Sequence, residues 1–166
     1  MAAIAAASGV SKPVLYDHFP SKEALFAAVL ESVQLELIVS SKAAVSTHQD
    51  PEGRMRAGVA AFFDFVGSRP TAARVMFVIP RHEAEAAEAA RDFQRQAIDV
   101  LTRFLRPDGT GDKQWLSSAS TEFFRSGLHG LVDWWARHPE VPRESLVEIV
   151  MDLVWRGLAA GPNNAA

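Results

Sequence analysis

Six residues near the start of the chain have side chains or backbone positions suited to contacting the phosphates and base edges of duplex DNA. They are Ser11, Lys12, Pro13, Tyr16, His18 and Lys22. The two lysines offer positive charge to phosphate and the tyrosine offers a hydroxyl, and both kinds of group are common in contacts to a nucleic-acid backbone. Taken singly, each lysine also suits a solvated surface and Tyr16 a half-buried packing position. The combination in one short segment is what predicts binding to double-stranded DNA.

The residues between these side chains predict a helix, a tight turn and a second helix. Gly9 accepts the positive φ that ends a helix, Ser11 is suited to cap the next one, and Pro13 suits its first turn. The apolar side chains spaced to face inward are Val10, Leu15 and Phe19. This order is that of a helix-turn-helix, whose second helix enters the major groove.

A second group of side chains is suited to lining a cavity for an unknown small hydrophobic ligand. The candidates are Phe62, Phe65, Phe77, Phe93 and His129. Aromatic residues at helical spacing also serve as plain core, so this interpretation competes with simple packing. For His129, which lies between Gly127 and Gly130, the alternative is a satisfied buried imidazole or a solvent-facing one.

Signals for catalysis, metals and cofactors are weak. The chain contains no cysteine, which excludes disulfides, thiol nucleophiles and cysteine metal sites and fits a reducing cytosol. The acidic segment of residues 81–88 matches no His-Glu zinc motif, and we find no Gly-rich phosphate loop or serine elbow. We expect a protein that is not an enzyme and that holds no metal and no cofactor. The competing interpretation is a small enzyme with a hydrophobic pocket, which would require several polar side chains to converge on one point in the folded core.

The elements that position these residues are all helices, because apolar residues recur at three and four positions and no stretch alternates long enough for a sheet. Ser21 is a plausible N-cap for a helix that ends near Ser46, and Asp50-Pro51 opens a helix that ends near Arg69. Further helices are expected at 71–79, 81–105, about 113–138 and about 142–158, with a loop at 107–111.

The last two of these helices are too apolar for one exposed face each. They form an antiparallel hairpin across the break at residues 139–141, and a second copy of the hairpin would complete a four-helix bundle. The glycines beside His129 favour a close approach of helices at this seam, although each costs about 1 kcal/mol against alanine. We therefore expect a homodimer formed through the last two helices.

The run from Ile4 to Leu25 resembles, nearly position by position, the DNA-binding signature of the tetracycline-repressor (TetR) family. The resemblance implies a recognition helix at residues 12–19, a connecting helix from Ser21, a helical ligand-binding core, and a dimer made by the last two helices. The family pattern also places a first helix before Met1, packed on the apolar side of Ile4, Leu15 and Phe19, and by this resemblance we expect the chain as given to lack that helix. Burying such side chains contributes about 1.5 to 3 kcal/mol each, so we expect the chain as given to bind DNA weakly.

The expected organisation is a partial helix-turn-helix domain over 1–24, a helical ligand-binding and dimerisation domain over 25–160, and a tail over 161–166. The net charge is −3, but residues 1–22 carry Lys12 and Lys22 against Asp17, a local balance of +1. With no membrane segment expected, we predict a cytoplasmic, ligand-responsive homodimer that represses transcription from a palindromic operator. The alternative is a truncated dimerising, ligand-binding module without effective DNA binding.

Overall fold

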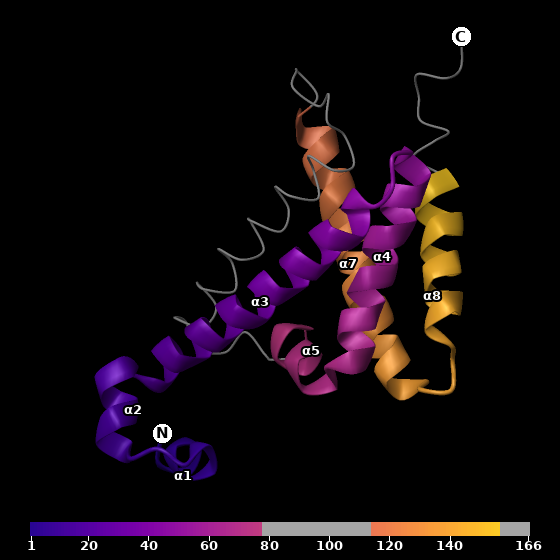
Figure 1. Ribbon diagram of the computed structural model, residues 1–166. Helices are drawn as coiled ribbons and strands as arrows, with labels where there is room; N and C mark the ends of the chain where they lie inside the picture. The colour runs from indigo at the N-terminus through magenta and orange to yellow at the C-terminus, as the bar shows by residue number, and fades with distance from the viewer. Residues whose placement is uncertain (78–113, 157–166) are drawn as a thin grey trace.

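The computed structural model describes residues 1–77 and 114–156, and within these ranges every regular element is a helix (Figure 1). The expected all-α fold is confirmed. The expected helix at 81–105, the loop at 107–111 and the tail at 161–166 lie outside the described residues.

The chain begins with two short helices, α1 (Ala2–Ser8) and α2 (Lys12–His18). Gly9 ends α1 with a φ of 69° and a ψ of 17°, which is the left-handed conformation that glycine adopts without a steric penalty. The backbone N–H of Val10 donates to the Ala5 carbonyl at 3.2 Å, which closes the turn. The predicted helix, turn and helix around Gly9 are therefore present.

Three helices follow, and the first two begin at the caps expected from the sequence. The long helix α3 (Lys22–Ser46) starts where the Ser21 side chain accepts a hydrogen bond from the Ala24 N–H at 3.0 Å. Helix α4 (Pro51–Ser68) starts where Asp50 accepts from the Gly53 N–H at 2.6 Å. Arg69 ends α4, and the short helix α5 (Pro70–Phe77) begins at the next residue.

The last described elements form the predicted helical hairpin. Helix α7 (Gln114–Arg137) is followed by a turn in which the indole N–H of Trp135 donates to the Val141 carbonyl at 2.9 Å. Helix α8 (Arg143–Val150) then continues into a π-helical segment, Met151–Trp155. The sequence predicted one α-helix to about Leu158, and this was wrong for the π-helical segment, because apolar spacing does not register a locally widened turn.

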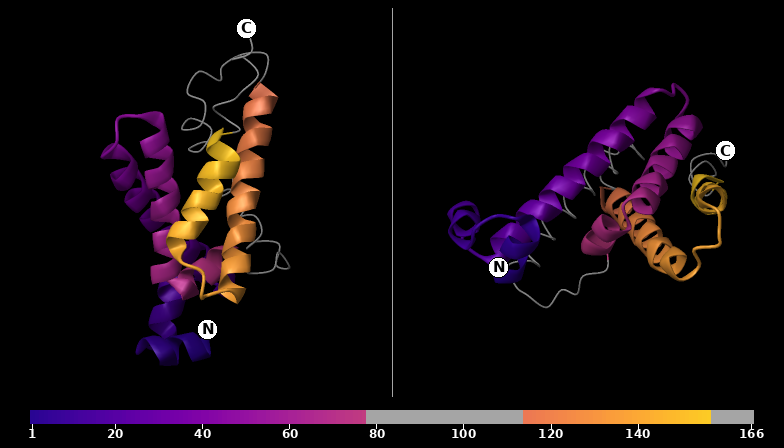
Figure 2. Two further views of the ribbon diagram at one scale, coloured as in Figure 1. Left: turned by 90° about the vertical axis from the view of Figure 1, so that its right-hand side faces the viewer. Right: turned by 60° about the horizontal axis from the view of Figure 1, so that its bottom comes forward.

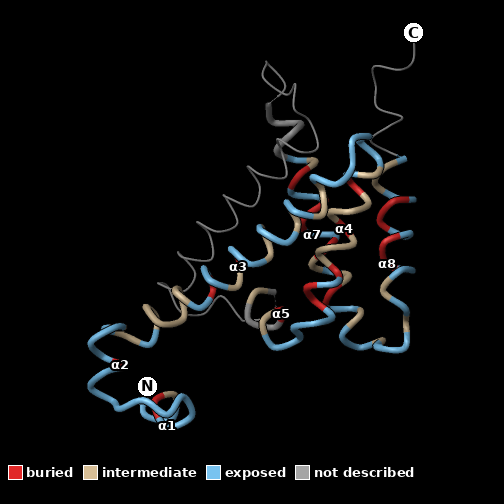
Figure 3. Tube along the Cα trace, viewed as in Figure 1, coloured by how far each residue is buried: buried red, intermediate tan, exposed pale blue. Residues whose placement is uncertain are grey.

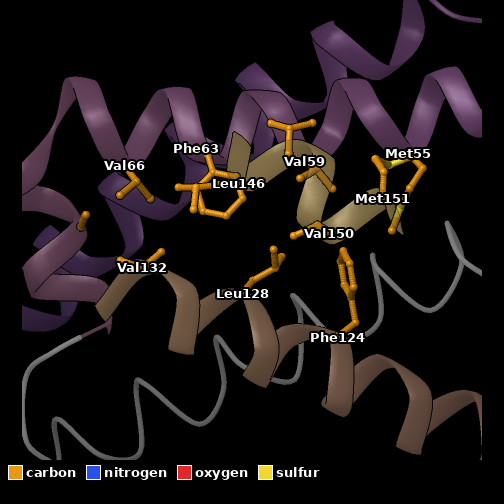
Figure 4. Packing of buried hydrophobic residues seen from close by; sticks show 12 residues of the cluster. Met55, Val59, Phe63, Val66, Phe124, Leu128, Val132, Leu146, Val150 and Met151 are labelled. Atoms are coloured by element: carbon orange, nitrogen blue, oxygen red, sulfur yellow. The ribbon is translucent and has the colours of Figure 1, made fainter. Parts of the chain in front are cut away.

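The hydrophobic core lies where α4, α7 and α8 meet (Figure 4). Phe63 from α4 and Leu146 from α8 are completely buried there, and Leu128 and Val132 reach the same cluster from α7. Phe63 also packs edge-on against Trp135, with ring centroids 6.0 Å apart. Side chains from three helices thus interlock in one cluster.

Helix α3 extends away from this core and holds α1 and α2 at its far end (Figures 1 and 2). Most of α3 is exposed or half-buried (Figure 3), and its buried residues are Leu30 and Gln34. By length and composition, α3 passes the test for a membrane-crossing helix, with a mean hydropathy of 1.5 over its most apolar window. That test is weak evidence for a single helix, and α3 carries Glu31 and Glu36 in its middle and packs against α4 and α5.

Candidate nucleic-acid interface

The six candidate DNA-contacting residues lie on the surface, five of them on α2 or at its N-cap and the sixth, Lys22, at the start of α3. Ser11, Lys12, Pro13, Tyr16, His18 and Lys22 are all exposed. In contrast, Leu15 on the opposite side of α2 is buried, together with Ala5 of α1. Helix α2 therefore packs on α1 with one face and presents a polar face to solvent, as a groove-reading helix requires.

Two details of this unit differ from the sequence prediction. Val10 was expected to face inward, but it lies in the link between α1 and α2 and is 40% exposed. Phe19 is half-buried, and its backbone N–H ends α2 by donating to the Leu15 carbonyl at 2.9 Å. The inner face of α2 is therefore held chiefly by Leu15.

Ser11 occupies the N-cap position of α2, but its side chain makes no capping hydrogen bond. Pro13 lies in the first turn, where the missing N–H leaves no unsatisfied partner. The prediction that Ser11 caps α2 is thus correct for its position and wrong for its hydroxyl. That exposed hydroxyl remains able to donate to phosphate.

The charges at the start of α3 lie close together. Lys22 is the first residue of α3 and Glu23 is the second. A hydrogen bond from its own backbone N–H, helped by one from the Ser21 hydroxyl, lowers the pKa of Glu23, so this carboxylate is charged at neutral pH. The negative charge beside Lys22 limits the local positive potential, so binding to DNA depends on the placement of single side chains more than on net charge.

The aromatic ligand candidates on α4 lie in two different environments. Phe62 is half-buried, packs against the main core and meets Phe63 edge-on at 5.2 Å between ring centroids. Phe65 is buried but lies outside that cluster, beneath the guanidinium of Arg69, whose Cζ is 5.5 Å from the ring centroid. The side chain of Phe77 and the whole of Phe93 lie outside the described residues. The described residues thus do not bring these candidates into one lining.

His129 belongs to a polar cluster on α7 that the sequence analysis did not identify. Arg125 is buried, and its Nη1 lies 3.2 Å from Nδ1 of His129. Nε of the same guanidinium donates to Glu122 at 3.0 Å, and this hydrogen bond lowers the pKa of the Glu122 carboxyl. The spacing of Glu122, Arg125 and His129 at three and four residues is the signal that would have revealed the cluster.

An apolar face of the hairpin is exposed to solvent. Phe123 on α7 is 74% exposed and Leu153 in the π-helical segment is 75% exposed, and Trp134 and Ile149 are also exposed. A Cβ built at Gly127 or Gly130 of α7 would meet nothing within 4 Å. This face combines large apolar side chains with a flat glycine-containing stretch, which is typical of a surface that another helix approaches closely.

Comparisons with known proteins agree with this geometry. Residues 1–29 match the family model of bacterial regulatory proteins, tetR family. The HTH-type transcriptional activator FasR of Mycolicibacterium smegmatis is 30% identical over 169 aligned positions, which cover 96% of this chain and 73% of FasR. Among solved structures, a TetR-like transcriptional regulator from Rhodococcus sp. RHA1 has a TM-score of 0.73 and 23% identity, covering 96% of this chain and 84% of its own. The fatty acid degradation regulator FadR from Bacillus halodurans has a TM-score of 0.79 and 16% identity, covering 95% and 86%.

Proposed function

The chain belongs to the TetR family of bacterial transcriptional regulators, and from that premise we propose that it is a cytoplasmic homodimer that represses transcription from a palindromic operator and responds to a small hydrophobic ligand. The observation that carries the proposal is the two-sided character of α2. One side packs through Leu15, while Lys12, Tyr16 and His18 are displayed on the surface at the far end of α3.

The homodimer follows from the exposed apolar face on α7 and the C-terminal helix. Full burial of a side chain such as Phe123 or Leu153 contributes about 1.5 to 3 kcal/mol to the free energy of association. A second copy of the same hairpin buries this face symmetrically as a four-helix bundle. Two copies of α2 would then face successive major grooves about 34 to 36 Å apart.

Ligand response is proposed through the aromatic residues of α4 and the polar cluster around His129. Phe65 is buried outside the main core, so a ligand that displaces its ring need not disrupt the Phe63 cluster. A coupling of about 1 to 3 kcal/mol between ligand and DNA changes operator affinity about 5- to 150-fold. FasR is named an activator. If the operator of this chain lies where the bound protein recruits RNA polymerase, the chain activates transcription and does not repress it.

The first test is selection of binding sites from random duplex DNA, followed by affinity measurements over a range of salt concentrations. We expect a palindromic consensus and a log affinity that falls linearly with log salt, because lysine contacts release counterions from DNA. Lys12→Ala should weaken binding on all sequences about equally and reduce the salt slope by about one. Lys42→Ala is the matched control, since Lys42 is an exposed lysine on α3 outside the candidate interface.

The opposing result is a chain that binds duplex DNA equally weakly with and without Lys12, and shows no sequence preference. That result would favour a dimerising, ligand-binding module without effective DNA binding, which is the second candidate function. The slight local basicity of residues 1–22 is the observation that favours it.

A further inference from the structure

We propose that Arg69 and Glu36 are positioning residues that fix the tilt of α3, and with it the position of α2, relative to the core formed by α4, α7 and α8. The ion pair between the guanidinium Nη1 of Arg69 and Oε1 of Glu36 joins the α4–α5 junction to the middle of α3. The expected effect of this pair on DNA binding rests on the proposed function, whereas its expected effect on the tilt of α3 does not.

Arg69 is attached firmly to the core side of this pair. It is the one residue between α4 and α5, and its backbone N–H donates to the Phe65 carbonyl at 3.0 Å. Its own carbonyl accepts from the Ala73 N–H at 2.9 Å, and Ala73 is a buried member of the core cluster. The backbone of Arg69 therefore cannot shift without moving the ends of two helices.

The ring of Phe65 also supports the Arg69 side chain. Its guanidinium lies over the Phe65 ring, 5.5 Å from the centroid, which is a cation–π geometry. Because Phe65 is buried, this ring gives the guanidinium a fixed support from which to reach Glu36. The flat guanidinium suits both contacts, so lysine would not replace it fully.

On the α3 side few side chains are buried, although the helix packs against α4 and α5, so a surface ion pair adds to a contact that buries little. Over its 25 residues, α3 has two buried residues, Leu30 and Gln34. If α3 pivots at Ser46, where the link to α4 begins, a tilt of about 10° moves Glu36 by about 3 Å and Lys22, about 36 Å along the helix, by about 6 Å. That displacement exceeds the tolerance of a hydrogen bond to a base or phosphate.

The pair is only half-buried, with 45% and 48% of the two side chains exposed, so its effect is moderate. Exposed ion pairs are worth at most about a factor of five in an equilibrium constant at moderate salt. We therefore expect its loss to widen the range of α3 tilts and to weaken operator binding about three- to five-fold.

The decisive experiment measures the tilt inside one chain and needs neither DNA nor ligand. The chain has no cysteine, so Ala7→Cys on α1 and Glu140→Cys in the α7–α8 turn provide two exposed sites for spin labels. Labelled chain is diluted with an excess of unlabelled chain, so that the distance distribution reports the pair within one protomer. We expect a distribution that broadens in Glu36→Gln and in Arg69→Gln. In the charge-reversed double variant, Glu36→Arg with Arg69→Glu, it should narrow again in part, because the ion pair returns but the contact of the guanidinium with the Phe65 ring does not.

The matched control is Glu148→Gln, which removes an exposed ion pair between Arg56 of α4 and α8. Those two helices are already joined by the buried core, so the control should leave the distance distribution unchanged. Its loss of thermal stability should be similar to that of Glu36→Gln. A distribution equally narrow in Arg69→Gln and in the parent chain would overturn the proposal. An unaltered operator affinity beside a broadened distribution would instead contradict the role of α2 in DNA binding, so the two failures are distinguishable.

Discussion

Helix α3 and the group formed by α4, α7 and α8 are held in place in different ways. Helix α4 has 18 residues and buries five of them, whereas α3 has 25 residues and buries two. Helices α4 and α8 are further linked by two ion pairs, Arg56 with Glu148 and Arg143 with Asp64. The core is thus held by interlocking buried side chains, whereas α3 packs against α4 and α5 through side chains that are mostly only half-buried. This difference suits the proposed response to a ligand, because elements that move in a regulator are those with low local stability.

The largest expected effect of a substitution lies in the core. Phe63→Ala removes a fully buried ring that packs against Phe62 and Trp135. Such a truncation costs about 3 to 5 kcal/mol, since the cavity collapses only in part. Urea unfolding should show this loss as a lower midpoint. Leu30→Ala on α3 is the comparison variant, and a loss equal to that of Phe63→Ala would contradict the difference between the two regions.

A smaller effect is expected at Leu15, the buried residue of α2. Leu15→Ala removes the main packing contact between α2 and α1, at a local cost of about 2 kcal/mol or more. We expect α2 to exchange its amide hydrogens faster while the amides of α4 and α8 keep their protection. Val14→Ala is the control, because Val14 on the same helix is 45% exposed. A uniform rise in exchange over all helices would show that α2 belongs to the core unit after all.

The smallest expected effect is the pH dependence contributed by Glu122. Its hydrogen bond from Arg125 lowers the folded-state pKa below the ordinary value of 4.5. A lowered folded pKa stabilises the protein above the unfolded value, and that contribution is lost as the pH falls through the folded pKa. The difference in free energy of unfolding between the parent chain and Glu122→Gln should therefore be present at neutral pH and shrink below pH 4.5. A difference that grows on acidification would have the wrong sign.

Local signals in the sequence predicted much of the fold. The starts of α3 and α4 follow from Ser21 and Asp50, because a cap acts through hydrogen bonds within three residues. The left-handed turn at Gly9 follows from the freedom of one residue. The two-sided exposure of α2 follows from the spacing of Leu15 against Lys12 and Tyr16.

Features that depend on distant partners could not be predicted from the sequence. Glu36 and Arg69 come together only because α4 folds back along α3, and nothing in their spacing indicates that contact. The separate environments of Phe62 and Phe65 are likewise set by which neighbours reach each ring. The π-helical segment at Met151–Trp155 changes the register of a helix that apolar spacing treats as uniform.

The most direct test of the account is amide hydrogen exchange of the chain with and without a selected palindromic duplex. If α2 reads the groove, added protection on DNA binding concentrates in residues 11–22, and α8 remains as protected as in the free protein. Protection that appears on α7 and α8 while residues 11–22 exchange unchanged would contradict the assignment of α2 as the DNA-reading element.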